Sequence, residues 1–140
     1  GLDQAALDSL PASLFGLYVR QQGLRDLGFL RRLNNLSFLH LGDNSIDDIS
    51  VLAGLPWLNS LILYGNLLTD ISPLLAMPWS IEGSWVDVSD NCLDLSVGSP
   101  AQAAVRELEE RGVTVYSEPQ FECGPAGAAG AWSAVFGVPA

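Results

Sequence analysis

The feature that most constrains this fold is a pattern that repeats every 22 residues through the middle of the chain. The shift aligns seven columns of equivalent residues, and most of them are apolar. Each column recurs 22 and 44 residues later, and the columns begin at Leu17, Val19, Gln22, Leu24, Leu27, Leu30 and Leu33. A fixed period of this length is typical of a solenoid, in which each repeat buries its apolar face against its neighbours.

Each repeat opens with two apolar residues separated by one residue, such as Leu39 and Leu41. This alternation predicts a short strand with both apolar side chains pointing inward, and successive strands would stack in parallel. The next position that recurs in the repeat holds Asn44, Asn66 and, in the displaced fourth copy, Asn91. An amide both donates and accepts hydrogen bonds, so we expect these residues to form a structural ladder where the chain turns.

A fourth copy of the pattern starts at Val86 and Val88, 25 residues after the third. The extra residues lie in the segment PWSIEGSW, which we interpret as a loop insertion. In the outer part of the first three repeats, Asp26, Asp48 and Asp70 each precede an apolar column. Short carboxylates at such positions are expected to cap helical turns.

The ends of the chain depart from the period. Residues 97–116 are predicted to form a cap made of a helix and a strand. Ser99 would be the N-cap of a helix from about 100 to 111, Gly112 its stop, and Val113 and Val115 the alternating residues of the strand. Residues 1–16 are expected to be an N-terminal cap or degenerate repeat, residues 17–96 the repeats, and residues 117–140 a poorly ordered tail rich in Gly and Ala.

Composition narrows the classes of partner. The 140 residues fit one domain, and 16 acidic against 6 basic side chains give a net charge of −10. This charge repels phosphate, so nucleic acid is excluded as a partner, and no apolar run is long enough to insert the repeat body into a membrane. The chain begins at Gly1 without a Met, which suggests a processed or excised piece.

The sequence offers no pattern for a metal site or another cofactor, because a single His and two Cys cannot supply the usual zinc ligand sets. Cys92 and Cys123 would pair in an oxidising compartment and remain thiols in a reducing one, and their number does not decide between the two states.

The segments LSFLHLGDNSIDDISVLAGL and LNSLILYGNLLTDISPLLAM make residues 14–116 similar to short leucine-rich repeats. The resemblance is to internalin-type bacterial surface proteins and to phosphatase-regulating repeat proteins, and the closing segment resembles the ends of repeat domains in bacterial secreted proteins. It implies an α/β solenoid: a right-handed superhelix with short parallel strands on a concave face that binds a partner. It also implies an extracellular or cell-surface location, with the cytoplasm as the alternative. Gln22 departs from the pattern, so the first turn is expected to be looser.

Residues that flank the buried strand positions should face outward together on the concave side. Aromatic and charged side chains there are typical of interaction surfaces. The predicted partner-binding residues are Tyr18, Arg20, Phe38, His40, Ile62, Tyr64, Trp85 and Asp87. We expect these aromatic side chains to have no packing role in the repeat.

The resulting hypothesis is a monomeric, non-enzymatic module that binds another protein. The alternative is a structural spacer within a larger secreted or surface protein. Two catalytic readings are disfavoured: His40 as a base on an exposed strand position, and Cys92 as a nucleophile beside Asp94. Asp87, Asp90 and Asp94 do not have the spacing of a calcium loop, and we interpret them as solvated carboxylates.

Overall fold

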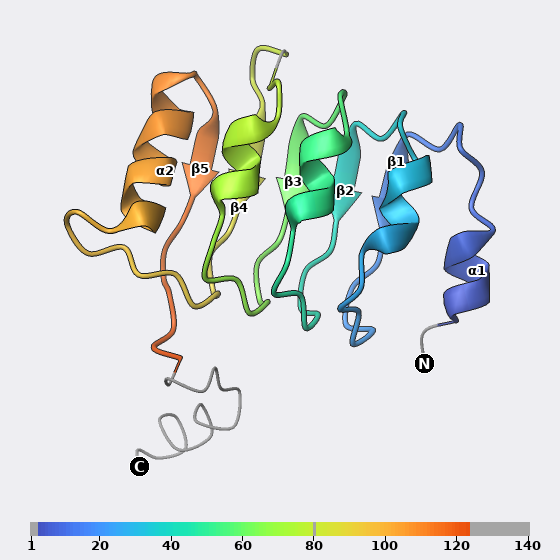
Figure 1. The fold of residues 1–140 in the computed structure, drawn as a ribbon, viewed down its shortest axis with the longest axis horizontal. Helices are drawn as coiled ribbons and strands as arrows, with labels where there is room; N and C mark the ends of the chain where they lie inside the picture. The colour runs from blue at the N-terminus through green and yellow to red at the C-terminus, as the bar shows by residue number, and fades with distance from the viewer. Residues whose placement is uncertain (1–2, 80, 124–140) are drawn as a thin grey trace.

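The computed structural model describes residues 3–79 and 81–123, and these residues form a solenoid with one parallel sheet along its length. The strands are β1 (Gly16–Tyr18), β2 (Phe38–His40), β3 (Ser60–Ile62), β4 (Trp85–Asp87) and β5 (Thr114–Tyr116), and they pair in chain order. Figure 1 shows them side by side and pointing the same way. The predicted fold class is confirmed.

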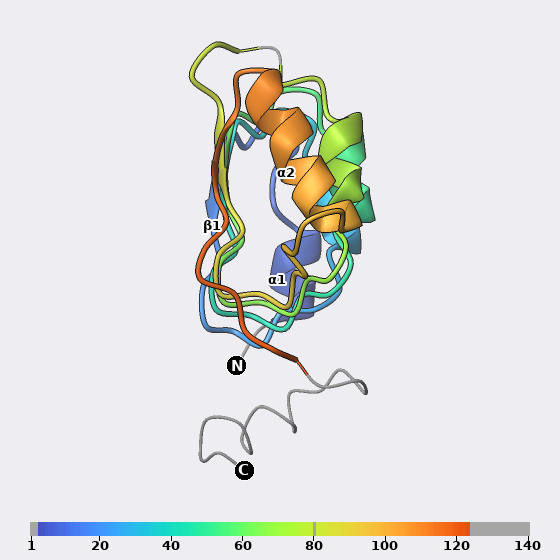
Figure 2. The ribbon, with the colours of Figure 1, turned by 90° about the vertical axis from the view of Figure 1, so that its left-hand side faces the viewer.

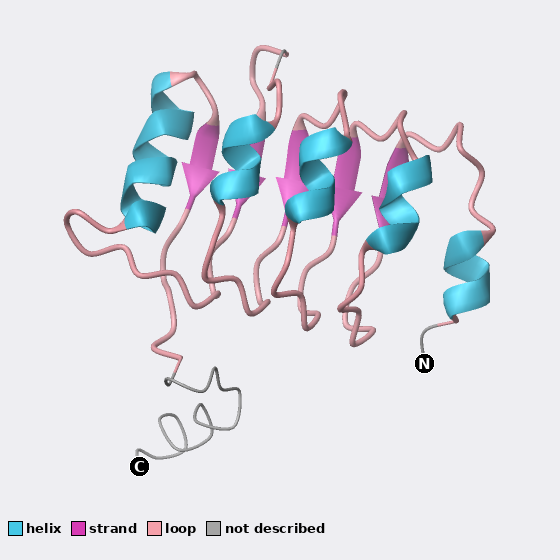
Figure 3. Cartoon of the chain, viewed as in Figure 1, coloured by secondary structure: helices cyan, strands magenta, loops and turns pink. Residues whose placement is uncertain are grey.

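Helices cover the side of the solenoid opposite the strands, as the view along its axis shows (Figure 2). Three 3₁₀ helices follow the first three strands, namely η1 (Gly28–Arg32), η2 (Ser50–Gly54) and η3 (Ser72–Ala76). Two α-helices lie near the ends of the chain (Figure 3), and they are α1 (Gln4–Asp8) and α2 (Pro100–Glu110). The α2 helix begins after Ser99, whose hydroxyl accepts a hydrogen bond from the Gln102 amide, and it runs over nearly the expected range.

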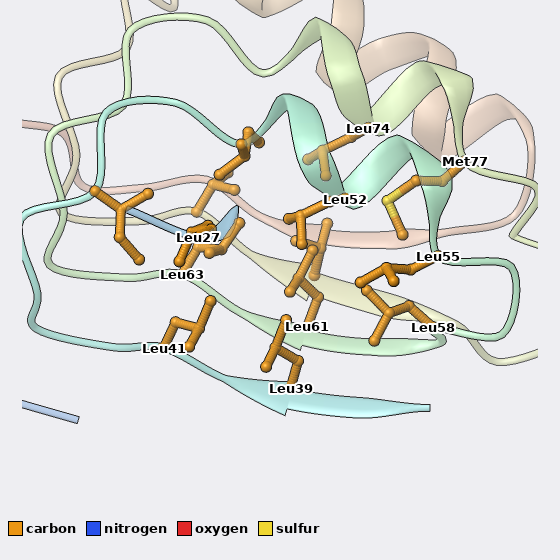
Figure 4. Close-up of a cluster of buried hydrophobic side chains, with 14 of the residues drawn as sticks. Leu27, Leu39, Leu41, Leu52, Leu55, Leu58, Leu61, Leu63, Leu74 and Met77 are labelled. Atoms are coloured by element: carbon orange, nitrogen blue, oxygen red, sulfur yellow. The ribbon is translucent and has the colours of Figure 1, made fainter. Parts of the chain in front are cut away.

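The strand register reproduces the repeat spacing read from the sequence. Leu17 pairs with Leu39 and Leu39 with Leu61, whereas Leu61 pairs with Val86 after the longer third repeat. Leu39, Leu61 and Val86 are fully buried, and they stack in a continuous core with leucines of the helical side (Figure 4). At about 1.5–3 kcal/mol for each buried aliphatic side chain, this core supplies the main driving force for folding.

The longer third repeat is not only a loop. Trp79, within the insertion, is 7% exposed, and its indole Nε1 donates a hydrogen bond of 2.7 Å to the Leu74 carbonyl. The insertion is therefore anchored to the core by an aromatic residue that the 22-residue pattern does not include.

Buried asparagine side chains connect adjacent coils at the turns that follow β2, β3 and β4. The Asn66 Oδ1 accepts a hydrogen bond from the Ile46 amide of the preceding coil at 3.0 Å, and its Nδ2 donates to the Leu41 and Leu63 carbonyls, each at 3.0 Å. Asn44 and Asn91 make equivalent bonds. In the first coil Gln22 replaces the asparagine, and its side chain is exposed and donates only to the Arg20 carbonyl at 3.2 Å.

The acidic residues of the outer side cap the 3₁₀ helices from one position earlier than the N-cap. Asp48 Oδ1 accepts from the Ser50 amide at 2.9 Å, although the N-cap residue of η2 is Ile49. These hydrogen bonds lower the pKa of the Asp48 carboxyl group. Asp26 and Asp70 accept the equivalent amide hydrogen bonds at 2.8 Å.

The segment that follows β5 is not a free tail, so the predicted boundary at 117 is wrong. The Gln120 Oε1 accepts hydrogen bonds from the Asn91 amide at 3.2 Å and the Leu93 amide at 3.0 Å, while its Nε2 donates to the Val88 and Ser117 carbonyls. This glutamine takes the place of the next asparagine in the ladder. The remainder of the predicted tail, residues 124–140, lies outside the described residues.

A disulfide between Cys92 and Cys123 lies beside this glutamine, with the two Cα atoms 5.5 Å apart. The Phe121 amide also donates to the Asn91 carbonyl at 2.9 Å. Residues 117–123 are thus held on the fourth coil by main-chain, side-chain and covalent links.

Replacing Asn66 with Ala should lower the free energy of unfolding by about 1 to 3 kcal/mol, because buried backbone groups of two coils lose their partners. Urea-induced unfolding followed by circular dichroism measures this change. Asn35→Ala is the control, since this exposed asparagine makes one side-chain bond, to the Ala12 carbonyl. Equal unfolding midpoints for Asn66→Ala and the wild type would contradict a structural ladder.

Replacing Gln120 with Ala should likewise destabilise the protein by about 1 to 3 kcal/mol, since the amides of Asn91 and Leu93 lose their acceptor. Gln22→Ala is the matched control, because that side chain is exposed and makes no ladder hydrogen bond to the backbone amides of a neighbouring coil. Unfolding midpoints of the two variants can be compared directly. If Gln120→Ala is no less stable than Gln22→Ala, the segment after β5 does not extend the ladder.

Candidate functional site

The strand face, defined as the solvent side of the five-stranded sheet, presents side chains in rows set by the register. The central row contains Tyr18, His40, Ile62, Asp87 and Tyr116, one from each strand. Neighbouring parallel strands lie about 4.8 Å apart, so consecutive side chains of a row touch or nearly touch. The register therefore places four of the eight predicted binding residues in one line.

The other predicted residues lie on either side of the central row. Phe38 and Trp85 belong to the row at the start of the strands, where Gly16, Ser60 and Thr114 are their neighbours. Arg20 and Tyr64 follow the strand ends, where main-chain hydrogen bonds between coils continue past the sheet.

His40 is buried, with 8% of its surface exposed, so the expectation of an exposed strand histidine is wrong. The Tyr18 ring lies 4.4 Å from the imidazole and the Tyr64 ring 5.5 Å from it, measured between centroids. His40 Nδ1 also accepts a hydrogen bond from the Gly42 amide at 3.2 Å. Tyr18 and Tyr64 therefore have a packing role, contrary to the expectation for these aromatic residues.

Gly42 permits this packing. A Cβ atom at residue 42 would lie 2.8 Å from the Tyr64 ring and 2.9 Å from the His40 ring, closer than real Cβ contacts come. Only a residue without a side chain lets both rings close over the backbone at this position. The two tyrosines and His40 thus form a compact aromatic cluster at the β1–β3 end of the strand face.

The surroundings of this cluster lower the pKa of the imidazole. Burial lowers the pKa of His40, and the positive charge of Arg20 lowers it further. Arg20 is held by Asp43, with Nε and Nη2 lying 3.0 and 2.8 Å from Asp43 Oδ2, and this hydrogen bond raises the pKa of the guanidinium. Arg20 is therefore a partly engaged cation at the edge of the strand face.

Tyr116 was not among the predicted binding residues, but it continues the central row beyond Asp87. Its ring is 53% exposed and makes an edge-to-face contact with Trp85, with centroids 6.2 Å apart. The alternation of Val113 and Val115 as inward residues places Tyr116 in the outward phase, so the sequence carried a signal for it.

The alternative chemistries have no assembled site in the described part of the chain. The Cys92 sulfur is bonded to Cys123 and is not a free thiol. Between residues 3 and 123, leaving out 80, no group of three or more His, Cys, Asp or Glu side chains is placed to hold a metal ion. Asp87 and Asp94 instead each accept hydrogen bonds from a serine two residues later.

The described helices were also compared with the length needed to cross a bilayer. None of those within residues 3–79 and 81–123 is long and apolar enough to do so.

Comparisons with known proteins agree with this geometry. Residues 34–76 match the family model described as leucine rich repeats in two copies. Internalin C2 of Listeria monocytogenes superimposes with a TM-score of 0.59 at 27% identity, covering 83% of this chain and 46% of that one. None of the curated proteins matches the sequence.

A second structure, the internalin inlF of Listeria monocytogenes, has a TM-score of 0.61 at 20% identity, covering 89% of this chain and 43% of that chain, and it bears on the fold alone. The fold is thus that of a short leucine-rich-repeat protein. Among solved structures it is similar to the Listeria internalins, and it spans less than half of either internalin chain.

The chain has one histidine, so the pKa of His40 can be measured without assignment ambiguity by following its imidazole protons by NMR. We expect the pKa to lie below the ordinary value near 6.5. Arg20→Gln should raise it, because a positive charge that disfavours the imidazolium is removed.

The same shift affects stability. Between the lowered pKa and about 6.5 the unfolded chain binds more protons than the folded one, so stability should fall as the pH drops below about 6.5. His40→Gln should reduce this loss, which melting temperatures at pH 7.5 and 5 would show. A His40 pKa at or above 6.5 would contradict the buried, neutral imidazole.

Proposed function

We propose that this protein is a monomeric interaction module that binds another protein through its strand face. The observation that carries the proposal is the gathering of aromatic side chains on one side of a rigid sheet. Tyr18 and Tyr116 are 62% and 53% exposed at the two ends of the central row, and Phe38 and Trp85 lie beside it. Large aromatic side chains in such positions are the ones that dominate binding energy at protein interfaces.

The ordered sheet that presents these side chains supports a protein partner. The row extends across five strands that are joined by continuous hydrogen bonding, so a partner would meet a surface that is already ordered. Binding to an ordered surface avoids the entropic cost of fixing loops. The net charge of −10 supports a protein over a nucleic acid.

A secreted or surface location in a bacterium fits two observations. The similar solved structure at 27% identity is an internalin of Listeria monocytogenes, and the chain contains a disulfide between Cys92 and Cys123. Structural disulfides persist mainly in oxidising compartments outside the cytosol. We therefore place the binding event outside the bacterial cell.

The test uses matched aromatic substitutions. Proteins that the immobilised chain captures from a cell-surface extract would be identified by mass spectrometry, purified and titrated with each variant. Tyr18→Ala and Tyr116→Ala should each cost about 1 to 4 kcal/mol of binding free energy, the range for aromatic anchors. Trp57→Ala is the control, because Trp57 is 54% exposed but lies in the turn between η2 and β3, outside the strands.

Circular dichroism would confirm that each variant is folded. Loss of binding in Trp57→Ala with full binding in both tyrosine variants would move the interface away from the strand face. If no captured protein depends on any of these residues, the repeat would serve as a structural spacer.

A further inference from the structure

Asp87 occupies an unusual position on the strand face, because it is an acidic side chain set within an aromatic surface. In β4 the intervening Val86 is fully buried, so Trp85 and Asp87 both point to the solvent side. Asp87 pairs in register with Ile62 on one side and with Tyr116 on the other. Asp87 therefore lies on the same face as Trp85 and beside Tyr116 in the register.

The carboxylate is oriented but has no cationic partner among the residues that the structure describes. The Ser89 amide and hydroxyl donate to it at 3.0 and 2.6 Å, and both bonds end on Oδ1. The ion pairs within the described residues join Arg20 to Asp43, Arg25 to Asp47 and Arg111 to Glu107, and none includes Asp87. Oδ2 thus remains available for a charge-assisted hydrogen bond from outside.

The neighbouring rings suit a cation. Trp85 and Tyr116 meet edge to face, with an interplanar angle of 80°. The ring that contributes its edge to this contact therefore keeps both of its faces free of the other ring. A guanidinium over a tryptophan or tyrosine face, within about 6 Å of the centroid, is attracted by the ring quadrupole. Ile62, half-buried on the other side of Asp87, offers apolar surface for methylene groups.

Desolvation decides between a cationic and an apolar occupant. A partner that covers this part of the strand face with apolar side chains would bury the Asp87 charge without compensation, which is strongly unfavourable. A guanidinium would neutralise that charge and stack on the rings at the same time. The net charge of −10 on the whole chain also favours the approach of a basic segment.

We propose that Asp87, Trp85 and Tyr116 form a receptor for one arginine side chain presented by a basic segment of the partner protein. This inference rests on the proposed function, since it assigns a chemistry to part of the same strand face. Asp87 supplies the charge and the hydrogen-bond acceptor, and the two rings supply the stacking surface.

The chain contains a matched control for Asp87. Asp94 Oδ1 accepts hydrogen bonds from the Ser96 amide and hydroxyl at 3.0 and 2.6 Å, the same arrangement as in Asp87 and Ser89. Asp94 lies between β4 and α2, outside the strands, and no ring contact involves it among the described residues. Asp94→Asn therefore removes one equivalent charge and leaves the proposed receptor intact.

The probe is a blocked pentapeptide, Gly-Ser-Arg-Ser-Gly, compared with the same peptide carrying citrulline, a neutral isostere of arginine. Titration into ¹⁵N-labelled protein would be followed by NMR at the Trp85 indole and the Asp87 and Tyr116 amides. We expect the arginine peptide to shift these resonances saturably and the citrulline peptide to bind at least fivefold more weakly. Asp87→Asn and Trp85→Leu should each weaken arginine binding at least fivefold, while Asp94→Asn should stay within twofold of the wild type.

Equal binding of the two peptides, or an Asp87→Asn variant that binds like the wild type, would overturn the proposal. The result is separable from the test of the proposed function. A captured partner that depends on Tyr18 but not on Asp87 would remove the arginine receptor and keep the strand-face interface. Saturable arginine binding at Trp85, with captured partners whose binding does not depend on strand-face residues, would keep the arginine receptor and remove the strand-face interface.

Discussion

The structure depends on the buried asparagine amides that follow strands β2, β3 and β4. A coil that turns inside a solenoid leaves backbone amides and carbonyls away from water, and each such group is costly unless it is hydrogen-bonded. Asn66 solves this for two coils at once, because it accepts from Ile46 in the preceding coil and donates to the Leu63 carbonyl in its own. Stacking of the strands, and hence the core, follows from the repetition of this bond.

The strand face is a consequence of the same repetition. Because the ladder fixes one register between coils, residues at equivalent positions line up across the sheet, and each side chain there has the equivalent residues of the adjacent coils as neighbours. The row from Tyr18 to Tyr116 arises in this way. A binding surface can therefore be varied residue by residue without changing the backbone that presents it.

The repeat spacing was sufficient to predict the fold, the register and the central row as far as Asp87, because these depend on periodic positions. Features that depend on non-periodic contacts were not predictable. Burial of His40 requires that Gly42 leave room for the Tyr64 ring, and the anchoring of the third repeat requires Trp79 to reach the Leu74 carbonyl. Gln120 lies 29 residues after Asn91, where a strict period predicts nothing, yet it makes the hydrogen bonds of a ladder asparagine.

Two halves of the strand face use their aromatic residues differently. Around His40 the rings pack on one another and on Gly42, which buries a neutral imidazole and leaves Arg20 bonded to Asp43. Around Asp87 the rings of Trp85 and Tyr116 meet edge to face beside a carboxylate that has no cationic partner in the described chain. In the first half the charged Arg20 is paired with Asp43, whereas in the second half Asp87 has no counter-charge among the described residues. A buried or half-buried charge is stable at an interface only when the partner supplies its counter-charge, so under the proposed function the side near β5 sets the chemistry of the partner.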